Sequence, residues 1–172
     1  MMKAGTKWLA WTLGAVLFQG CTGSQASVVP TETRSEANMT KRVKGPFDVK
    51  VKPMAPDAEP TAYPVGRMSL DKKYHGELEG TGSGQMLATM DANQSGGYVA
   101  LERVTGTLQG RKGSFVIQHS GLMARGVPTL VISVVPDSGT DELKGLTGSM
   151  QIHIDAQGNH TYEFDYALAD AP

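Results

Sequence analysis

Residues 96–119 read GGYVALERVTGTLQGRKGSFVIQH, and this stretch decides the fold. Apolar residues occupy every second position of two runs, 97–109 and 114–121, and the turn sequence QGRKG at 109–113 separates the runs. Alternation with a period of two predicts half-buried strands, and a glycine-containing turn between two such runs predicts a hairpin. The stretch therefore predicts two neighbouring antiparallel strands, each with one apolar face.

The same alternation continues along the rest of the chain after residue 42. No helical period of useful length interrupts it, and short turn sequences separate the runs. Because parallel strands need long crossover connections, we expect an antiparallel sheet. One run, LVISVV at 130–135, is continuously apolar and predicts a strand that is buried on both faces. The other expected strands are 43–51, 65–75, a third that follows Gly76 and ends near Met90, 129–135, 147–155 and 160–168.

A meander of eight strands leaves no unpaired edge strand if its first and last strands pair and the sheet closes into a barrel. We therefore expect an all-β protein with a closed eight-stranded antiparallel barrel, mostly up-and-down, and a two-sheet sandwich is the alternative. A barrel of this size encloses either packed side chains or one small ligand. Gly80, Gly82 and Gly84 share one face of the third strand, which permits sharp coiling or the close approach of a backbone or ligand. The prolines between residues 53 and 64 predict a surface loop that crosses one end of the barrel.

The chain begins with the pattern of an export signal. Lys3 and Lys7 flank the start of an apolar run, 8–18, which is too short to span a bilayer and fits a secretory signal peptide. The run ends in LFQGC at 17–21, which resembles the bacterial lipobox although its phenylalanine and glutamine are unusual there. The resemblance implies cleavage before Cys21 and a lipid on its sulfur. A secreted protein with a spare thiol is the alternative.

These patterns divide the chain into a signal peptide, 1–20, a lipidated cysteine with a flexible polar tether, 21–42, and a barrel domain, 43–172. Thr22 stands where aspartate would hold a lipoprotein in the inner membrane, which favours the outer membrane. We expect a bacterial envelope lipoprotein at the periplasmic face of the outer membrane, attached to the membrane through its lipid anchor only. A secreted or periplasmic protein is the alternative.

Composition and motifs exclude several kinds of partner. The 172 residues carry 16 basic and 17 acidic side chains, without the basic excess that nucleic-acid binding needs. No helix follows the glycine-rich segment GTGSG at 80–84, so no phosphate site is predicted. The four histidines lack metal-ligand spacing, so we expect neither a metal nor a cofactor. The sequence predicts no oligomeric state.

Polar residues on the apolar faces of the central hairpin form the main candidate site. Glu102 shares one face of its strand with Tyr98, and His119 lies on the apolar face of the next strand. A two-residue turn at Gly110-Arg111 places Glu102 opposite His119. A four-residue loop shifts the register by two and keeps both on one side, whereas a three-residue loop separates them. Facing the barrel interior, these residues are candidates for a ligand anchor, an acid and base, or a structural hydrogen bond.

His75 and Glu77 form a secondary candidate beside Gly76, at the rim between the second and third expected strands. Their positions alternate with those of Tyr74 and Leu78. This parity favours a solvated face over a site.

Five ordered segments carry a family resemblance: KGPFDVKV at 44–51, GRMSLDKKYHGELEGTGSGQML at 66–87, the hairpin at 96–119, VVPDSGTDELKGLTGSM at 134–150 and HTYEFDYAL at 160–168. Together they resemble the bacterial family catalogued as domain of unknown function 3224. The resemblance implies a barrel like that of allene oxide cyclase and no established activity. Because members of the family often start near a residue such as Met39, it also implies that residues 1–38 are an added export and anchoring module, unless Met39 is the true start.

Three functions are compatible with these observations. The first is an envelope lipoprotein whose barrel binds a small apolar or amphipathic molecule. The second is a cyclase or isomerase that acts in the lumen, where a dry cavity and one or two polarising groups suffice. The third is a structural envelope protein whose barrel is filled by its own side chains.

Overall fold

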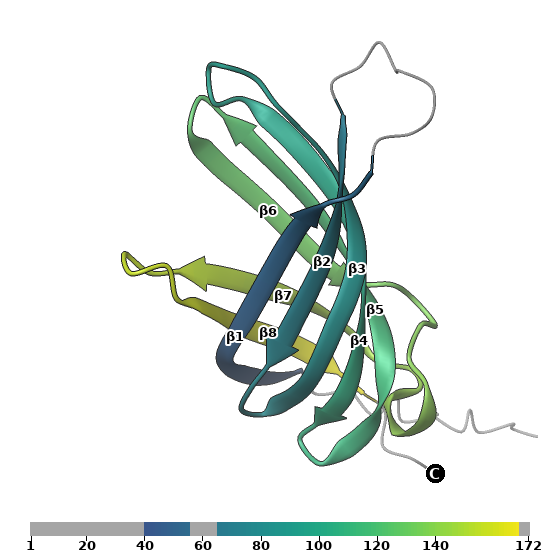
Figure 1. Ribbon diagram of the computed structural model, residues 1–172. Coiled ribbons are helices and arrows are strands. Elements are labelled where there is room, and N and C mark those ends of the chain that lie inside the picture. Colours follow the sequence, from purple (N-terminus) through teal and green to yellow (C-terminus); the bar gives the residue numbers. More distant parts are fainter. Residues whose placement is uncertain (1–39, 56–64, 169–172) are drawn as a thin grey trace, which may run out of the picture. The chain divides into compact units, whose positions relative to one another are not determined.

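The computed structural model describes residues 40–55 and 65–168, which form one β-barrel (Figure 1). The strands pair in chain order from β1 to β8, and β8 pairs with β1 to close the barrel. All the pairings are antiparallel, so the expected closed meander is confirmed and the sandwich alternative is wrong. The strands are β1 (Lys41–Pro53), β2 (Gly66–Tyr74), β3 (Leu78–Met90), β4 (Gly96–Leu108), β5 (Arg111–Ala124), β6 (Val127–Val134), β7 (Thr147–Ile154) and β8 (His160–Ala167), with a short 3-10 helix η1 (Asp141–Leu143) between β6 and β7.

The turn between β4 and β5 lies one residue earlier than expected. Gln109 and Gly110 both have positive φ angles, 46° and 85°, as the two central residues of a tight hairpin turn require. Arg111 therefore already belongs to β5, which is longer than the expected strand. This turn pairs Ala100 with His119 and Glu102 with Ile117.

One end of the barrel, which we call the packed end, is filled by side chains. It lies where β1, β3, β5 and β7 begin. Tyr162, Phe164 and Tyr166 alternate inward along β8, and Phe164 stacks on Phe115 with 5.7 Å between ring centroids. Helix η1 adds Leu143 to this core. Side chains from all eight strands thus meet in one continuous apolar cluster.

The expectation that the apolar run 130–135 is buried on both faces is wrong. Ile132 and Val134 of β6 are buried, but Val131, which faces outward, is 57% exposed. In the described residues no second layer covers the outer face of β6, so its outward positions are open to water.

At the opposite end, which we call the open end, the pairing between neighbouring strands is interrupted in two places. β6 and β7 pair only at Ser133 and Ser149. The pairing of β1 with β8 stops at Phe47 and His160, although β1 continues to Pro53 beside β2. The tip of the β7–β8 hairpin consequently leans away from the neighbouring strands, as the yellow segment in Figure 1 shows.

The predicted signal peptide, Cys21, nearly all of the predicted tether and the centre of the proline-rich loop lie outside the described residues. β1 begins at Lys41, so the last two residues of the predicted tether belong to the first strand. Arg42 is held there by ion pairs with Asp165 and Glu163 of β8. No helix in the described part of the chain is long and apolar enough to cross a membrane.

Candidate functional site

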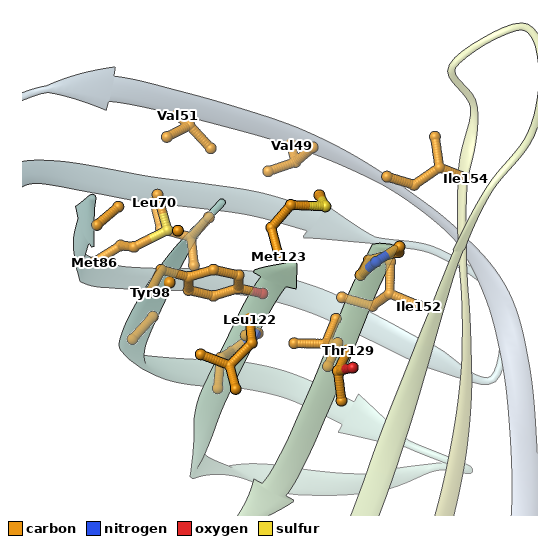
Figure 2. A pocket seen from close by; sticks show the side chains of 18 of the residues that line it. Val49, Val51, Leu70, Met86, Tyr98, Leu122, Met123, Thr129, Ile152 and Ile154 are labelled. Atoms are coloured by element: carbon orange, nitrogen blue, oxygen red, sulfur yellow. The ribbon is translucent and has the colours of Figure 1, made fainter. Parts of the chain in front are cut away.

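A cavity of about 590 Å³ occupies the open half of the barrel. Its walls are mostly aliphatic, and Figure 2 shows Val49, Leu70, Met86 and Ile152 reaching it from four different strands. Polar side chains from β2, β4 and β5 contribute to its lining: Lys72, Tyr98 and His119. The lining also contains Thr89, Thr129 and His160. The cavity is therefore a mostly apolar chamber in which the first three polar side chains lie on one side and His160 lies on β8.

Glu102 lies beneath this chamber and is fully buried. Its Oε1 accepts a hydrogen bond of 2.8 Å from the hydroxyl of Tyr74. Its Oε2 accepts from Lys72 Nζ at 2.9 Å and from His119 Nε2 at 3.1 Å. The carboxylate of Glu102, on β4, thus binds two side chains of β2 and one of β5. It connects these two strands, which are separated in the sheet by β3 and β4.

The surroundings of Glu102 hold it in the charged form. Burial alone would raise the pKa of the carboxyl group. The hydrogen bond from His119, the charge of Lys72 and the hydrogen bonds from Lys72 and Tyr74 outweigh burial, so the pKa of Glu102 is lowered below its ordinary value. The buried ammonium of Lys72 is balanced by this carboxylate and lies 5.0 Å from the centroid of the Phe47 ring.

The two ring nitrogens of His119 have different surroundings. Because Glu102 is a carboxylate, which only accepts hydrogen bonds, His119 must carry a proton on Nε2 and donate it. Among the described residues, no group bonds to Nδ1, and no buried side-chain nitrogen or oxygen lacks a partner. Nδ1 is therefore accessible from the cavity that His119 lines, and in the neutral ring it is an acceptor.

Tyr98 projects into the same cavity. Figure 2 shows its ring extending from the wall with the hydroxyl oxygen on the cavity side. The ring lies across Gly121, where a Cβ atom would come within 2.1 Å of a ring carbon. Burial and the negative charge of Glu102 raise the pKa of Tyr98, so its hydroxyl keeps its proton. No described residue accepts or donates a hydrogen bond at this hydroxyl.

Gly82 makes room for the buried carboxylate. A Cβ atom at this position would lie 1.9 Å from Glu102 Oε1. The glycines of β3 were expected to permit the close approach of a backbone or ligand. At Gly82 the approaching group is a side chain of the protein itself.

The structure brings together Glu102, His119 and Tyr98, the main candidates of the sequence analysis. The predicted register is wrong by two residues, because the turn is Gln109-Gly110 rather than Gly110-Arg111. A shift of two keeps the parity, so Glu102 and His119 still face the same side and meet diagonally. Glu102 and His119 therefore still lie close together, although they are not directly opposite each other on the two strands.

Sequence reasoning missed two members of the site, Lys72 and Tyr74. Tyr74 was considered only as a residue whose position alternates with those of His75 and Glu77. Lys72 has the same parity as Tyr74 and was not considered. A lysine between apolar residues on an inward face is the signal that would have found it.

His75 and Glu77 lie at the β2–β3 turn, at the packed end, and are not part of this cluster. His75 Nε2 is 3.0 Å from a carboxylate oxygen of Asp48. Glu77 accepts hydrogen bonds from Gln109 Nε2 and from the backbone N–H of Lys44. Both side chains are on the surface, as their parity indicated. Within the described ranges, no group of three or more His, Cys, Asp or Glu side chains is arranged to hold a metal ion.

The arrangement can do two things chemically. Tyr98 and His119 offer a donor and an acceptor to a molecule in an apolar chamber. The carboxylate of Glu102 also fixes the tautomer of His119, so that Nδ1 is able to take up a proton from a bound molecule.

Comparisons with known proteins agree with one another. The family described as "Protein of unknown function (DUF3224)" matches residues 43–166. The crystal structure of a protein with unknown function from the same family, from Shewanella oneidensis MR-1, is 47% identical. The match covers 77% of this chain and 100% of that chain, with a TM-score of 0.70. No curated protein matches this chain.

Proposed function

The chain belongs to the DUF3224 family, and from the geometry of its site we propose that the barrel binds one small apolar or amphipathic molecule in the cavity of its open end. The observation that carries the proposal is the cavity itself. Its volume of about 590 Å³ falls in the range of small-molecule sites, roughly 300–1,000 Å³. A mostly apolar lining with a few polar groups is also what such sites have.

The rim of the open end supports the same proposal. Large apolar side chains are exposed where β1, β3, β5, β6 and β7 end or begin at this opening. The packed end has no exposed large apolar side chain among the described residues. Of the two ends of the barrel, only the open end therefore offers an apolar molecule a compatible rim. The exposed residues of the rim are Val51, Met90, Leu122, Val127 and Ile154.

The cavity also argues against a barrel that serves only as a filled scaffold. Packed aromatic side chains fill one half of the lumen, as that alternative requires. The lining of the other half includes Ala88 and Ala100, whose small side chains leave space open.

Titration of the full chain with Nile red, a neutral apolar dye, tests the proposal. Ala88→Trp places a large ring in the cavity, whereas Leu87→Trp places the same ring on the outer face of the same strand. We expect the dye to bind and Ala88→Trp to weaken binding at least tenfold, with Leu87→Trp close to the parent protein. Absence of dye binding, or equal binding by both variants, would contradict the proposal.

A second candidate function is a lumenal isomerase or cyclase. The observation that favours it is the hydrogen bond from His119 Nε2 to Glu102, which leaves Nδ1 as a base facing the cavity. Glu102→Gln separates this candidate from simple binding. If the protein is an enzyme, the variant loses turnover of its substrate and keeps binding. If it is a binding protein, no turnover exists to be lost.

The location proposed for this activity is the bacterial envelope, with a lipid on Cys21. The support is the pattern of the first 21 residues. We expect Cys21→Ser to release the protein from the membrane fraction of its host. Unchanged membrane association of this variant would count against the lipid anchor.

A further inference from the structure

The polar side of the cavity determines which kind of amphipathic molecule fits it. We infer that the ligand is an uncharged molecule with a hydroxyl group at the end that enters the cavity first. This hydroxyl accepts a hydrogen bond from Tyr98 and donates one to His119 Nδ1. The inference rests on the proposed function and adds the chemical class of the ligand.

The charge balance of the site excludes an anionic ligand. Lys72 is the only lysine or arginine among the described residues that line the cavity, and no aspartate or glutamate lines it. Its ammonium group already lies 2.9 Å from Glu102 Oε2 and 3.3 Å from the hydroxyl of Tyr74.

Of the described residues that line the cavity, His160 is the one other besides this lysine and His119 that can carry a positive charge. It lies on β8 with its ring 5.2 Å from the Phe47 ring, whereas Tyr98 and His119 lie on β4 and β5. A fatty-acid carboxylate beside Tyr98 and His119 would be a second buried anion near Glu102, and the lysine there is already shared, which is costly in an apolar chamber.

The unoccupied hydrogen-bonding atoms of the site select a hydroxyl group. Tyr98 keeps its phenolic proton and has no partner in the described structure, so it can donate. His119 uses its Nε2 proton on Glu102, so Nδ1 can only accept while the ring is neutral. A carbonyl group would satisfy Tyr98 and leave Nδ1 without a donor. A hydroxyl group is a donor and an acceptor at once and satisfies both.

Most of the lining beyond this polar side is apolar, with Thr129 and His160 among the exceptions. Met86 and Ile152 line the chamber, and Leu122 borders its opening (Figure 2). The body of the ligand is thus expected to be hydrocarbon, with its far end toward the open rim.

Three probes that share one chain length test this inference: 1-octanol, octanoate and n-octane, each measured by displacement of Nile red. We expect octanol to bind at least tenfold more tightly than octanoate at neutral pH. Tyr98→Phe removes one hydrogen bond and keeps the ring on Gly121. It should weaken octanol binding about three- to tenfold and leave octane binding unchanged.

Tyr166→Phe is the matched control, because Tyr166 donates its hydroxyl proton to Gln109 Oε1 at the packed end and does not line the cavity. This variant should bind octanol as the parent protein does. Equal binding of octanol and octanoate, or no effect of Tyr98→Phe on octanol, would overturn the inference while octane still binds. If neither octane nor the dye binds, the proposed function itself fails.

Discussion

The packed end and the open end of the barrel are made from the same eight strands and differ in the volume of their inward side chains. Inward positions at the packed end carry Tyr162, Phe164 and Phe115, which meet across the lumen. Inward positions at the open end include Ala88 and Ala100. A barrel of fixed strand number has a nearly constant width, so large inward residues fill it and small ones leave a cavity.

The boundary between the two ends is the buried cluster around Glu102. It replaces apolar packing by hydrogen bonds among Lys72, Tyr74, Glu102 and His119. Every member of this cluster has a partner, so the polar groups do not cost the free energy of unsatisfied burial. The packed end therefore stabilises the fold, whereas the open end has space for a ligand.

Truncation of one large side chain at each end gives the largest expected contrast. Phe164→Ala removes a fully buried ring and should lower the free energy of unfolding by about 3–5 kcal/mol. Met86→Ala removes a half-buried side chain that already borders an open space, so we expect less than about 1.5 kcal/mol. Urea denaturation of both variants measures the two losses. Equal losses would show that the two ends do not differ in packing.

Filling the space beside Glu102 tests the boundary between the ends. In Gly82→Ala, the added methyl group would overlap Glu102 Oε1, which cannot move without losing its partners. We expect a loss of about 1–3 kcal/mol in unfolding free energy.

Gly66→Ala is the control for this substitution, because it changes another strand glycine whose added Cβ would find its nearest neighbour, a backbone oxygen, at 3.8 Å. It should change stability by less than about 1 kcal/mol. If Gly82→Ala lowers the free energy of unfolding no more than Gly66→Ala does, the carboxylate of Glu102 has more room than the structure indicates.

The smallest expected effect is the pH dependence that Glu102 contributes. Its pKa in the folded protein lies below the ordinary value of 4.5. Its ion pair therefore stabilises the fold above pH 4.5, and this contribution is lost as the pH falls through the pKa of the folded state.

Comparison with Glu102→Gln isolates this contribution, because Asp48, Asp155 and Asp165, which also have lowered pKa values, are present in both proteins. We expect the stability difference between the two proteins to shrink as the pH falls below 4.5 and Glu102 takes up a proton. A difference that does not vary with pH would argue against a charged Glu102 in the folded protein.

Much of the candidate site follows from residue parity. Glu102, His119 and Tyr98 alternate with outward residues on their strands, and this alone predicts that they face the lumen. The same rule applied to β2 would have added Lys72. The register that places Glu102 diagonally across from His119 could not be predicted, because the sequence QGRKG allows several turns and each sets a different register.

The sequence by itself determined the strands, their order, their inward faces and the distribution of large and small inward residues. All of these depend on neighbours within a few positions, because a strand repeats every two residues and hairpins link adjacent strands. The tertiary structure alone decided that Lys72, Tyr74 and His119 share the carboxylate of Glu102 and that β6 and β7 pair at a single point. These features depend on register, barrel closure and the fit of side chains from distant strands, and no local pattern contains that information.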